Sequence, residues 1–410
     1  MRYFTPEYKL ATLESEGNKL LKKFECALPV LASDFASFLG KIAAMKKSHG
    51  SFVQVVTRRS QHLLGSKVTA ADWNVSFLLN FEVASEIKLL LENFRDFNGH
   101  HIKTIDAPLK VFHPHEVIYT IENTCENIIS KNMSVFVSDA SDDGAYCFEA
   151  NTMSFAKDFT FNEDERVVSS SLRELLAVEK TLTQHKDYFK EKSGEVVYWI
   201  TDSKCCASFL KKGSRKAHIQ DVLLKIKRVE FELKLTIVPI WAPRSDFNLI
   251  MADLGSRLCT STDEWKIDEF SFNMLQRHFD VEFTFDCFAT TLNTRCKKFF
   301  SYLPQMGTCG INFFAQSLLP AEKYWICPPP NLVLKALKKV LTTKNIAAVF
   351  CIPVWTHKNY WSTLTQHNQF VSFVQKPVVF APVFVPDYKM SSTIFRGKKN
   401  FQMLSFFVST

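Results

Sequence analysis

The sequence predicts an α/β protein in which a mixed five-stranded sheet with flanking helices is preceded by a helical region and followed by a second α/β domain. Three features along the chain support this prediction. Apolar residues recur every three or four positions up to about residue 100, which is typical of amphipathic helices. From about residue 132, short apolar runs alternate with turn residues and then with helical stretches. Beyond residue 270, strands and helices alternate again, which is typical of an α/β domain.

Length and composition describe a globular protein with more than one domain. At roughly 150 residues per domain, 410 residues suggest two or three units, each able to bury its own core. Hydrophobic residues make up 46% of the chain and charged residues 22%, which excludes the collagen-like, low-complexity and disordered classes. The 50 Lys and Arg residues exceed the 42 Asp and Glu residues by 8, the sign expected of a protein that binds phosphate backbones.

No apolar run in the sequence predicts a membrane segment. Charged residues rather than an apolar signal region follow the first residues, and the longest apolar candidate, 378–385, is broken by Pro382. The 11 cysteines form no Cys-x-x-Cys pair, so we expect buried thiols rather than a zinc site. We therefore expect an intracellular protein, cytoplasmic or nuclear, without a membrane partner.

Residues 1–125 are predicted to form a helical region. Apolar stripes over 13–43 and 77–97 have helical spacing, and Asn98-Gly99 provides a stop for the last helix. Lysines and arginines lie between and beside these stripes. They fit either a solvated face or a face that contacts phosphates, and the pattern leaves both interpretations open.

Residues 130–260 are predicted to hold the five-stranded sheet. A helix is expected to start after Ser170 or Ser171, either of which can cap it, and a short closing helix is expected after Asn248. The expected strands span residues 133–138, 144–150, 152–159, 196–201 and 233–241, and further helices span 205–210 and 219–229. This succession gives a mixed sheet with helices on its faces.

Four carboxylates lie at the ends of predicted strands or near the starts of predicted helices. Asp139 closes the first strand, and Glu174 lies in the first turn of the capped helix. Asp202 ends the fourth strand, and Asp253 opens the final helix. A right-handed crossover makes the first and fourth strands neighbours, so Asp139 and Asp202 are expected side by side with Glu174 close to both. Carboxylates that are so crowded repel one another unless cations lie between them.

The arrangement predicts a site for two Mg²⁺ ions, held by Asp139, Glu174, Asp202 and Asp253, in which Mn²⁺ can substitute. Two ions about 4 Å apart can activate a water and stabilise the leaving oxygen during phosphodiester hydrolysis. Each acid alone has a simpler interpretation, as a turn residue, a helix cap or a partner of a helix dipole. The order Asp, Glu, Asp, Asp with gaps of 35, 28 and 51 residues favours the metal site.

Short motifs surround the four acids. They are Val-Ser-Asp-Ala-Ser at 137–141, Ser-Leu-Arg-Glu-Leu at 171–175, Thr-Asp-Ser at 201–203 and the closing segment 241–257. With these motifs, residues 133–258 resemble a ribonuclease H domain of the retroelement type. The resemblance implies Mg²⁺-dependent cleavage of the RNA strand of RNA–DNA hybrids and gives the metal-ligand role to the four acids. Many relatives have a His before the last Asp that helps product leave, and its absence from this chain implies slower turnover.

The resemblance also implies a nucleic-acid interface around the acids. In this fold, the second helix of the domain borders the DNA strand of the hybrid, although a solvated face explains its basic residues equally well. The residues expected to bind nucleic acid are Ser141, Ser203, Lys204, Lys211, Lys212, Arg215, Lys216, Asn248 and Arg257.

Tryptophans in or beside the predicted strands are expected in the core, namely Trp199, Trp241, Trp325 and Trp355. Tyr360 and Trp361 are instead expected at the surface, where they could stack on a base.

The flanks carry further resemblances. The segments 33–45 and 73–99 resemble the thumb and connection that follow a reverse-transcriptase palm. A set of short carboxyl-terminal segments resembles the adenine-methyltransferase-like domain of DIRS-like retrotransposons, at 285–289, 299–301, 328–329 and 352–355. The whole chain thus resembles the carboxyl part of a DIRS-like polymerase protein, with a degenerate, Rossmann-like methyltransferase domain over 270–410.

Two missing features separate the candidate functions. The chain has no Tyr-x-Asp-Asp hairpin for a polymerase palm, so it is not expected to polymerise alone, and a palm encoded upstream becomes a candidate partner beside the RNA–DNA hybrid. Cys327 stands where a methyltransferase needs an Asp or Asn, and no glycine-rich loop follows Asp286. The leading hypothesis is a ribonuclease H; the alternative is a catalytically inactive nucleic-acid-binding remnant, and a DNA adenine methyltransferase ranks last.

Overall fold

The structure, a computed structural model, describes most of the chain, namely residues 3–68, 72–99, 133–150, 152, 154–258, 265–367, 369–382, 384–386 and 402–410. The chain divides into two compact units, Met1–Asn151 with Asp158–Arg257 and Thr152–Lys157 with Leu258–Thr410. Each unit is considered by itself below. The part of the predicted helical region that follows residue 99 lies outside the described residues.

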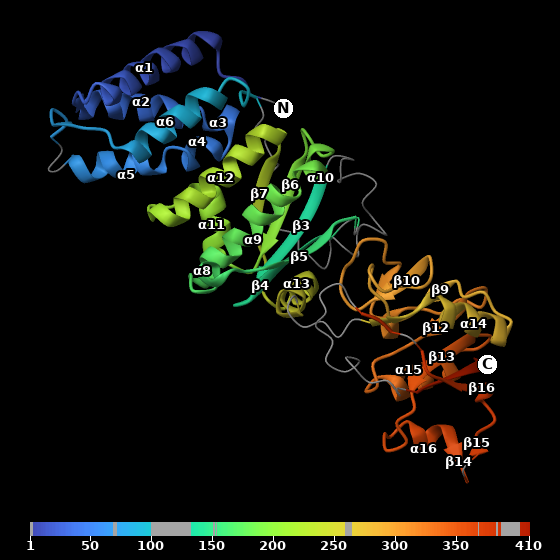
Figure 1. Cartoon of the computed structure of the whole chain (residues 1–410). Helices are drawn as coiled ribbons and strands as arrows, with labels where there is room; N and C mark the ends of the chain where they lie inside the picture. Colours follow the sequence, from blue (N-terminus) through green and yellow to red (C-terminus); the bar gives the residue numbers. More distant parts are fainter. Residues whose placement is uncertain are drawn as a thin grey trace. The chain divides into compact units, whose positions relative to one another are not determined.

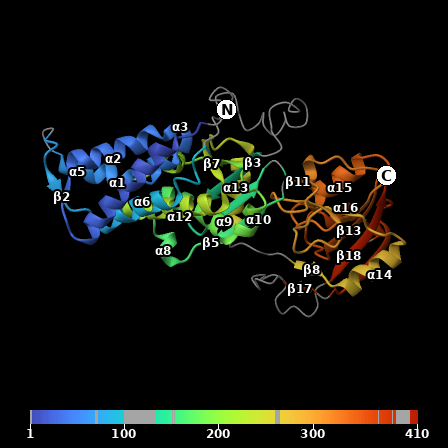
Figure 2. The ribbon, with the colours of Figure 1, turned by 90° about the horizontal axis from the view of Figure 1, so that it is seen from above.

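A helical bundle begins the first unit, as the spacing of apolar residues predicts (Figure 1). In α1 the buried residues are Leu10, Leu13, Gly17 and Leu20, so one apolar stripe faces the bundle. Figures 1 and 2 both show the longer helices lying alongside one another. The elements are α1 (Glu7–Glu25), β1 (Val30–Leu31), α2 (Ala32–Ala44), α3 (Lys46–His49), α4 (Phe52–Val55), α5 (Arg58–Lys67), β2 (Ser76–Phe77) and α6 (Phe81–Asn93).

The bundle packs directly on helix α12 (Ala217–Leu233), which belongs to the following sheet domain. The ring of Phe231 lies edge-on to Phe52 and Phe97, with centroid distances of 4.4 and 4.7 Å. Beside these rings, the side-chain amide of Gln220 donates to the backbone oxygen of Val55 at 2.7 Å and to the buried carboxylate of Glu86 at 3.1 Å. Helix α12 therefore contributes Leu224 and Phe231 to the core of the helical bundle.

A five-stranded mixed sheet with flanking helices follows, in the order β5-β4-β3-β6-β7. The strands are β3 (Met133–Ala140), β4 (Gly144–Glu149), β5 (Ala156–Thr160), β6 (Val196–Thr201) and β7 (Thr236–Trp241). β3 pairs antiparallel with β4 and parallel with β6, and β6 pairs parallel with β7. This topology is ribonuclease H-like, and it confirms the fold class that the sequence predicts.

The connecting helices cover the sheet and also follow the predicted order. α9 packs on β3 and β4 and against α12, while α11 packs on β7. They are α8 (Glu163–Arg166), α9 (Ser170–Gln184), α10 (Lys186–Lys190), α11 (Lys204–Lys212), α12 and α13 (Phe247–Leu258). α9 begins at Ser170, with Ser169 at the cap position, so the predicted caps Ser170 and Ser171 are one and two residues too late.

The second unit contains a seven-stranded sheet in the order β11-β10-β9-β12-β13-β18-β16. Its first five members in this order pair in parallel, and β18 runs antiparallel to both of its neighbours. The strand order reverses between β9 and β12, which makes the domain Rossmann-like. Its sheet strands are β9 (Phe285–Asp286), β10 (Lys298–Ser301), β11 (Gly310–Ile311), β12 (Lys323–Ile326), β13 (Ala347–Pro353), β16 (Gln375–Phe380) and β18 (Met403–Ser409).

Alternate residues of these strands enter two separate cores. Tyr324 and Ile326 face the core that includes α15, whereas Trp325 faces the core that includes α14. The remaining elements of the unit are β8 (Trp265–Ile267), α14 (Glu269–Phe279), a short 3₁₀ turn (Phe313–Ala315), α15 (Val333–Thr342), α16 (Trp361–Leu364), β14 (Thr365–Gln366), β15 (Gln369–Phe370) and β17 (Phe384–Pro386). Within the described residues, no helix combines the length and the apolar character that a membrane crossing requires.

Candidate metal centre

Three carboxylates from three different elements converge at one edge of the five-stranded sheet. Asp139 lies in β3, Glu174 lies in α9, and Asp202 follows β6 directly. One oxygen of each carboxylate lies within 4.8 Å of the others. The parallel pairing of Val137 with Ile200 explains the approach, because Asp139 and Asp202 each follow two residues later. Asp139, Glu174 and Asp202 are called the acidic triad below.

The acidic triad is buried and hydrogen-bonded. Asp139 is 6% exposed and Glu174 is 5% exposed. The hydroxyl of Ser256 on α13 donates to Oδ2 of Asp139 at 2.9 Å. The backbone N–H of Ala140 points toward Oε1 of Glu174 at 3.4 Å. The three carboxylates are therefore held by the fold itself, on elements that are distant in sequence.

Burial makes ionisation of Asp139 and Glu174 unfavourable. It is the main cause that raises the pKa of Asp139 to about 6, and the charges of Asp202 and Asp253 act in the same direction. The Ser256 hydrogen bond opposes this rise. Burial, followed by the charges of Asp139 and Asp202, holds the pKa of Glu174 well above its usual range. A divalent cation would relieve this repulsion, and a cluster of carboxylate oxygens is the donor set that Mg²⁺ and Mn²⁺ prefer.

The structure places Asp253 differently from the other three acids. It is the seventh residue of α13 rather than the residue that opens it, because Asp246 caps the helix by accepting from the backbone N–H of Asn248 at 2.9 Å. The carboxylate of Asp253 is not among the three that converge, and it forms an ion pair with Arg257 at 2.7 Å. Its side chain is 45% exposed. The expectation that Asp253 opens the helix is therefore wrong. Its negative charge nevertheless contributes to the raised pKa of Asp139.

Three residues lie beside Asp202. Arg244 and Trp241 were not among the predicted site residues, and Lys204 was predicted only to bind nucleic acid. Arg244, in the loop after β7, donates from Nε to Oδ2 of Asp202. Trp241 donates from its indole nitrogen to the backbone oxygen of Asp202 at 2.9 Å, and the Nζ of Lys204 lies 4.4 Å from the centre of its ring. Trp241 is 44% exposed, so its predicted place in the core is wrong. Its position at the last residue of an edge strand, before Ala242-Pro243, is the signal that could have indicated exposure.

The residues predicted to bind nucleic acid differ in their burial and in their hydrogen-bond partners. Ser141 donates to the backbone oxygen of Ser256 at 2.9 Å, and Ser203 caps α11 by accepting from the N–H of Cys206. Asn248 is 2% exposed, and Arg257 is paired with Asp253. The basic residues are exposed on α11 and the turn after it, at Lys204, Lys211, Lys212, Arg215 and Lys216.

Two aromatic residues of the second unit also differ from the sequence prediction. Tyr360 is fully buried and donates its hydroxyl to the backbone oxygen of Pro353 at 2.8 Å. Trp361 is partly buried against the core that contains Tyr360. The proposed base-stacking role of this pair is therefore wrong for Tyr360.

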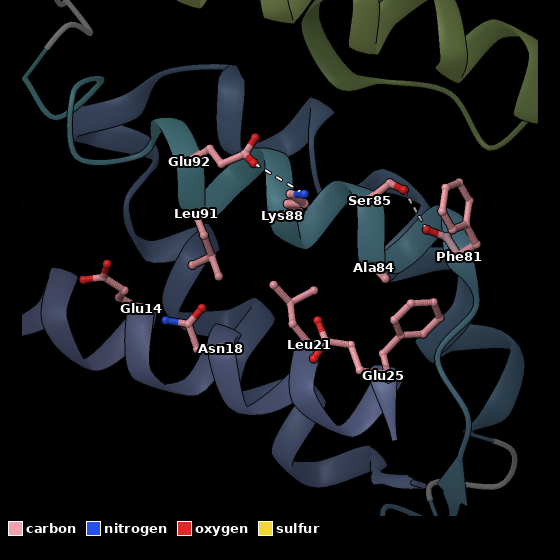
Figure 3. Close-up of a pocket in the computed structure, with 11 residues that line it drawn as sticks. Glu14, Asn18, Leu21, Glu25, Phe81, Ala84, Ser85, Lys88, Leu91 and Glu92 are labelled. Carbon is pink, nitrogen blue, oxygen red and sulfur yellow. Dashed lines mark hydrogen bonds and ion pairs between the residues drawn. The ribbon is translucent and has the colours of Figure 1, made fainter. Parts of the chain in front are cut away.

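A hollow of about 520 Å³ lies elsewhere in the first unit, between α1 and α6 (Figure 3). Leu21, Leu91 and Ala84 face into it, and Glu14, Glu25 and Glu92 stand around it. Its lining comes only from these two helices and includes no member of the acidic triad.

Comparisons with known proteins give only distant likenesses. No protein-family model matches the chain, and no curated protein matches it. A solved structure of native prototype foamy virus protease-reverse transcriptase matches at 12% identity over 45% of this chain and 21% of the other, with a TM-score of 0.21. A foamy viral protease-reverse transcriptase in complex with double-stranded DNA matches at 13% identity over 51% of this chain and 31% of the other, with a TM-score of 0.20.

The chain spans between about a fifth and a third of the length of these matched structures. The ribonuclease H-like fold is defined by the strand order of this chain, β5-β4-β3-β6-β7.

Proposed function

We propose that this chain is a metal-dependent ribonuclease H that cleaves the RNA strand of RNA–DNA hybrids and derives from a retroelement of the DIRS-like group. The observation that carries the proposal is the convergence of Asp139, Glu174 and Asp202 within 4.8 Å on a sheet of order β5-β4-β3-β6-β7. Three carboxylates that lie this close repel one another when they are ionised, and a bound cation removes that repulsion.

The proposal gives the residues the following roles. Asp139, Glu174 and Asp202 hold Mg²⁺, or Mn²⁺ in its place, and Asp253 supplies a further carboxylate from α13. When two such ions are bound, they provide an activated water and stabilise the leaving oxygen in phosphodiester hydrolysis. Ser256 keeps Asp139 oriented through its 2.9 Å hydrogen bond.

The substrate class is argued from charge and shape. A site made of carboxylates repels phosphates unless cations are close, and exposed basic residues on α11 and the turn after it supply positive charge on the same domain. Recognition of a hybrid by its shape and by 2′-hydroxyls does not need a base-specific pocket. A reverse-transcriptase palm encoded upstream is proposed as a further partner.

A second candidate function is a nucleic-acid-binding remnant without catalysis. The observation in its favour is that two acids of the predicted quartet already have arginine partners, since Arg244 binds Asp202 and Arg257 binds Asp253. In this alternative, the arginines neutralise the site permanently and no divalent ion binds.

A cleavage assay separates the two candidates. The full chain is incubated with an RNA–DNA hybrid labelled on the RNA strand, in Mg²⁺ and separately in Mn²⁺, next to matched DNA–DNA and RNA–RNA duplexes. We expect cleavage of the hybrid alone, with a rate that falls about a thousandfold in Asp139→Asn and Asp202→Asn, because several kcal/mol of transition-state stabilisation depend on the bound ions.

Asp187→Asn is the matched control, because that carboxylate belongs to the same unit but is 96% exposed and pairs only with Lys190 among the described ion pairs. Its rate should equal that of the wild type. Binding of the hybrid without cleavage in either metal would contradict the nuclease and support the remnant.

A further inference from the structure

Trp241 is an exposed aromatic side chain at the rim of the acidic triad. It ends the edge strand β7 and lies opposite Thr201, the residue directly before Asp202. With 44% of its surface exposed, it contributes far less to the core than Trp199, which is fully buried on the neighbouring strand. A large exposed aromatic beside a candidate site indicates a contact surface.

The ring of Trp241 is held in place rather than free to rotate. Its indole N–H donates to the backbone oxygen of Asp202 at 2.9 Å, and the ammonium of Lys204 lies 4.4 Å from its ring centre. Lys204 is the first residue of α11, so the ring contacts both the residue that follows β6 and the start of α11. A ring that is already ordered loses little conformational entropy when a ligand packs against it.

A second cation completes the rim. The side chain of Arg244 is 87% exposed, and its Nε donates to Oδ2 of Asp202. A guanidinium presents five N–H donors, so the fork of Arg244 keeps outward-facing donors for a phosphate. Trp241, Lys204 and Arg244 thus place an aromatic ring and two positive charges immediately beside the carboxylates.

We infer that Trp241, Lys204 and Arg244 form a docking element for one strand of the bound nucleic acid next to the acidic triad. The ring of Trp241 packs against a sugar or base, and Lys204 and Arg244 bind the adjacent phosphates. An exposed ring flanked by cations is the combination by which proteins hold a nucleic-acid strand without reading its sequence. The inference rests on the proposed function for the identity of the strand, which is that of an RNA–DNA hybrid.

The docking element is tested by binding in the absence of catalysis. The full chain is titrated into a fluorescently labelled RNA–DNA hybrid in EDTA, and fluorescence anisotropy gives Kd at several salt concentrations. Trp241→Ala is expected to raise Kd about tenfold, the range for the loss of one aromatic stack. Trp241→Phe keeps a ring and should raise Kd by no more than about threefold.

Arg244→Ala tests the charge independently of folding, because its side chain is 87% exposed. It is expected to raise Kd and to reduce the slope of log Kd against log salt by about one. Trp73→Ala is the matched control, since Trp73 is 46% exposed in the helical bundle, and its Kd should stay within about twofold of the wild type. Circular dichroism confirms that each variant is folded.

The outcomes separate this inference from the proposed function. Cleavage by the wild type together with unchanged Kd values for Trp241→Ala and Arg244→Ala would overturn the docking element and leave the nuclease standing. Loss of binding in both variants without any cleavage by the wild type would support the docking element and overturn the nuclease. A wild type that neither binds the hybrid in EDTA nor cleaves it in Mg²⁺ or Mn²⁺ would overturn both.

Discussion

Ser256 donates a hydrogen bond of 2.9 Å to Asp139, although 117 residues separate them in the chain. The bond joins the closing helix α13 to the central strand β3. It also opposes the effect of burial on the pKa of Asp139, because it stabilises the charged carboxylate. The orientation of the acidic triad therefore depends on a residue that is not itself a metal ligand.

Removal of this hydroxyl should weaken metal binding. Ser256→Ala leaves the ionised Asp139 without a donor, so a proton competes better with Mg²⁺, and we expect about a tenfold increase in the Kd for Mg²⁺ near pH 7. Isothermal titration calorimetry measures it. Ser256→Thr keeps a hydroxyl and should restore much of the affinity, whereas Ser66→Ala, which removes an exposed hydroxyl on α5, should have no effect. Equal affinities for Ser256→Ala and the wild type would exclude this role.

Neutralising one acid of the triad should stabilise the metal-free protein. The pKa of Asp139 is raised from 3.8 to about 6, so the stability that the neutral form provides is present below about pH 4 and lost as the pH rises through 6. At pH 8 the ionised group costs about 3 kcal/mol, and Asp139→Asn should recover much of it. Urea unfolding in EDTA measures the difference, which should vanish near pH 4. A less stable Asp139→Asn at pH 8 would contradict the proposed crowding.

Glu86 should make the stability of the packing between the helical bundle and α12 depend on pH. It is fully buried, and burial raises its pKa from 4.5 to about 7. Its stabilising neutral form is therefore lost as the pH rises through 7, and the expected loss is about 3 kcal/mol. Between pH 5 and pH 8, the free energy of unfolding should decrease less in Glu86→Gln than in the wild type. The same fall in both proteins would assign the pH dependence to other groups.

Gly255 should be required where α13 meets the sheet. A Cβ at this position would lie 2.3 Å from the ring of Tyr146 on β4, so in Gly255→Ala the ring or the helix must shift, and a shift of the helix moves Ser256 relative to Asp139. We expect a loss of about 1–3 kcal/mol and weaker Mg²⁺ binding. Gly65→Ala on α5 is the matched control, because its Cβ would meet nothing within 4 Å, and it should be stabilised by about 0.5–1 kcal/mol. Thermal unfolding compares the two variants.

Local patterns were sufficient to predict the elements that form the site. The short apolar run of β6, Val196–Thr201, was predicted with its bounds, because its length and its β-branched and aromatic residues favour a strand over a helix. The approach of Asp139 to Asp202 followed from the handedness of a crossover between parallel strands. These inferences needed only periodicity and topology.

Contacts between distant segments could not be predicted in the same way. The hydrogen bond from Gln220 to Glu86 spans 134 residues, and no local pattern marks either residue as its partner. The start of α13 was missed because Asp246, rather than Asn248, caps the helix. Trp241 was expected in the core because it lies at a predicted strand, while its exposure is set by the edge position of β7.

The dependence of Asp139 on Ser256 has a consequence for the order of synthesis. Among the elements of the site, β3 is synthesised first. The segments α9, β6 and α12 must follow before α13 can contribute the hydroxyl of Ser256. Such long-range closure is slow compared with the folding of the amino-terminal helices, whose contacts are more local. A nascent chain that ends before residue 256 therefore carries its acids in an unfinished arrangement, and the complete site appears only once the whole unit has emerged.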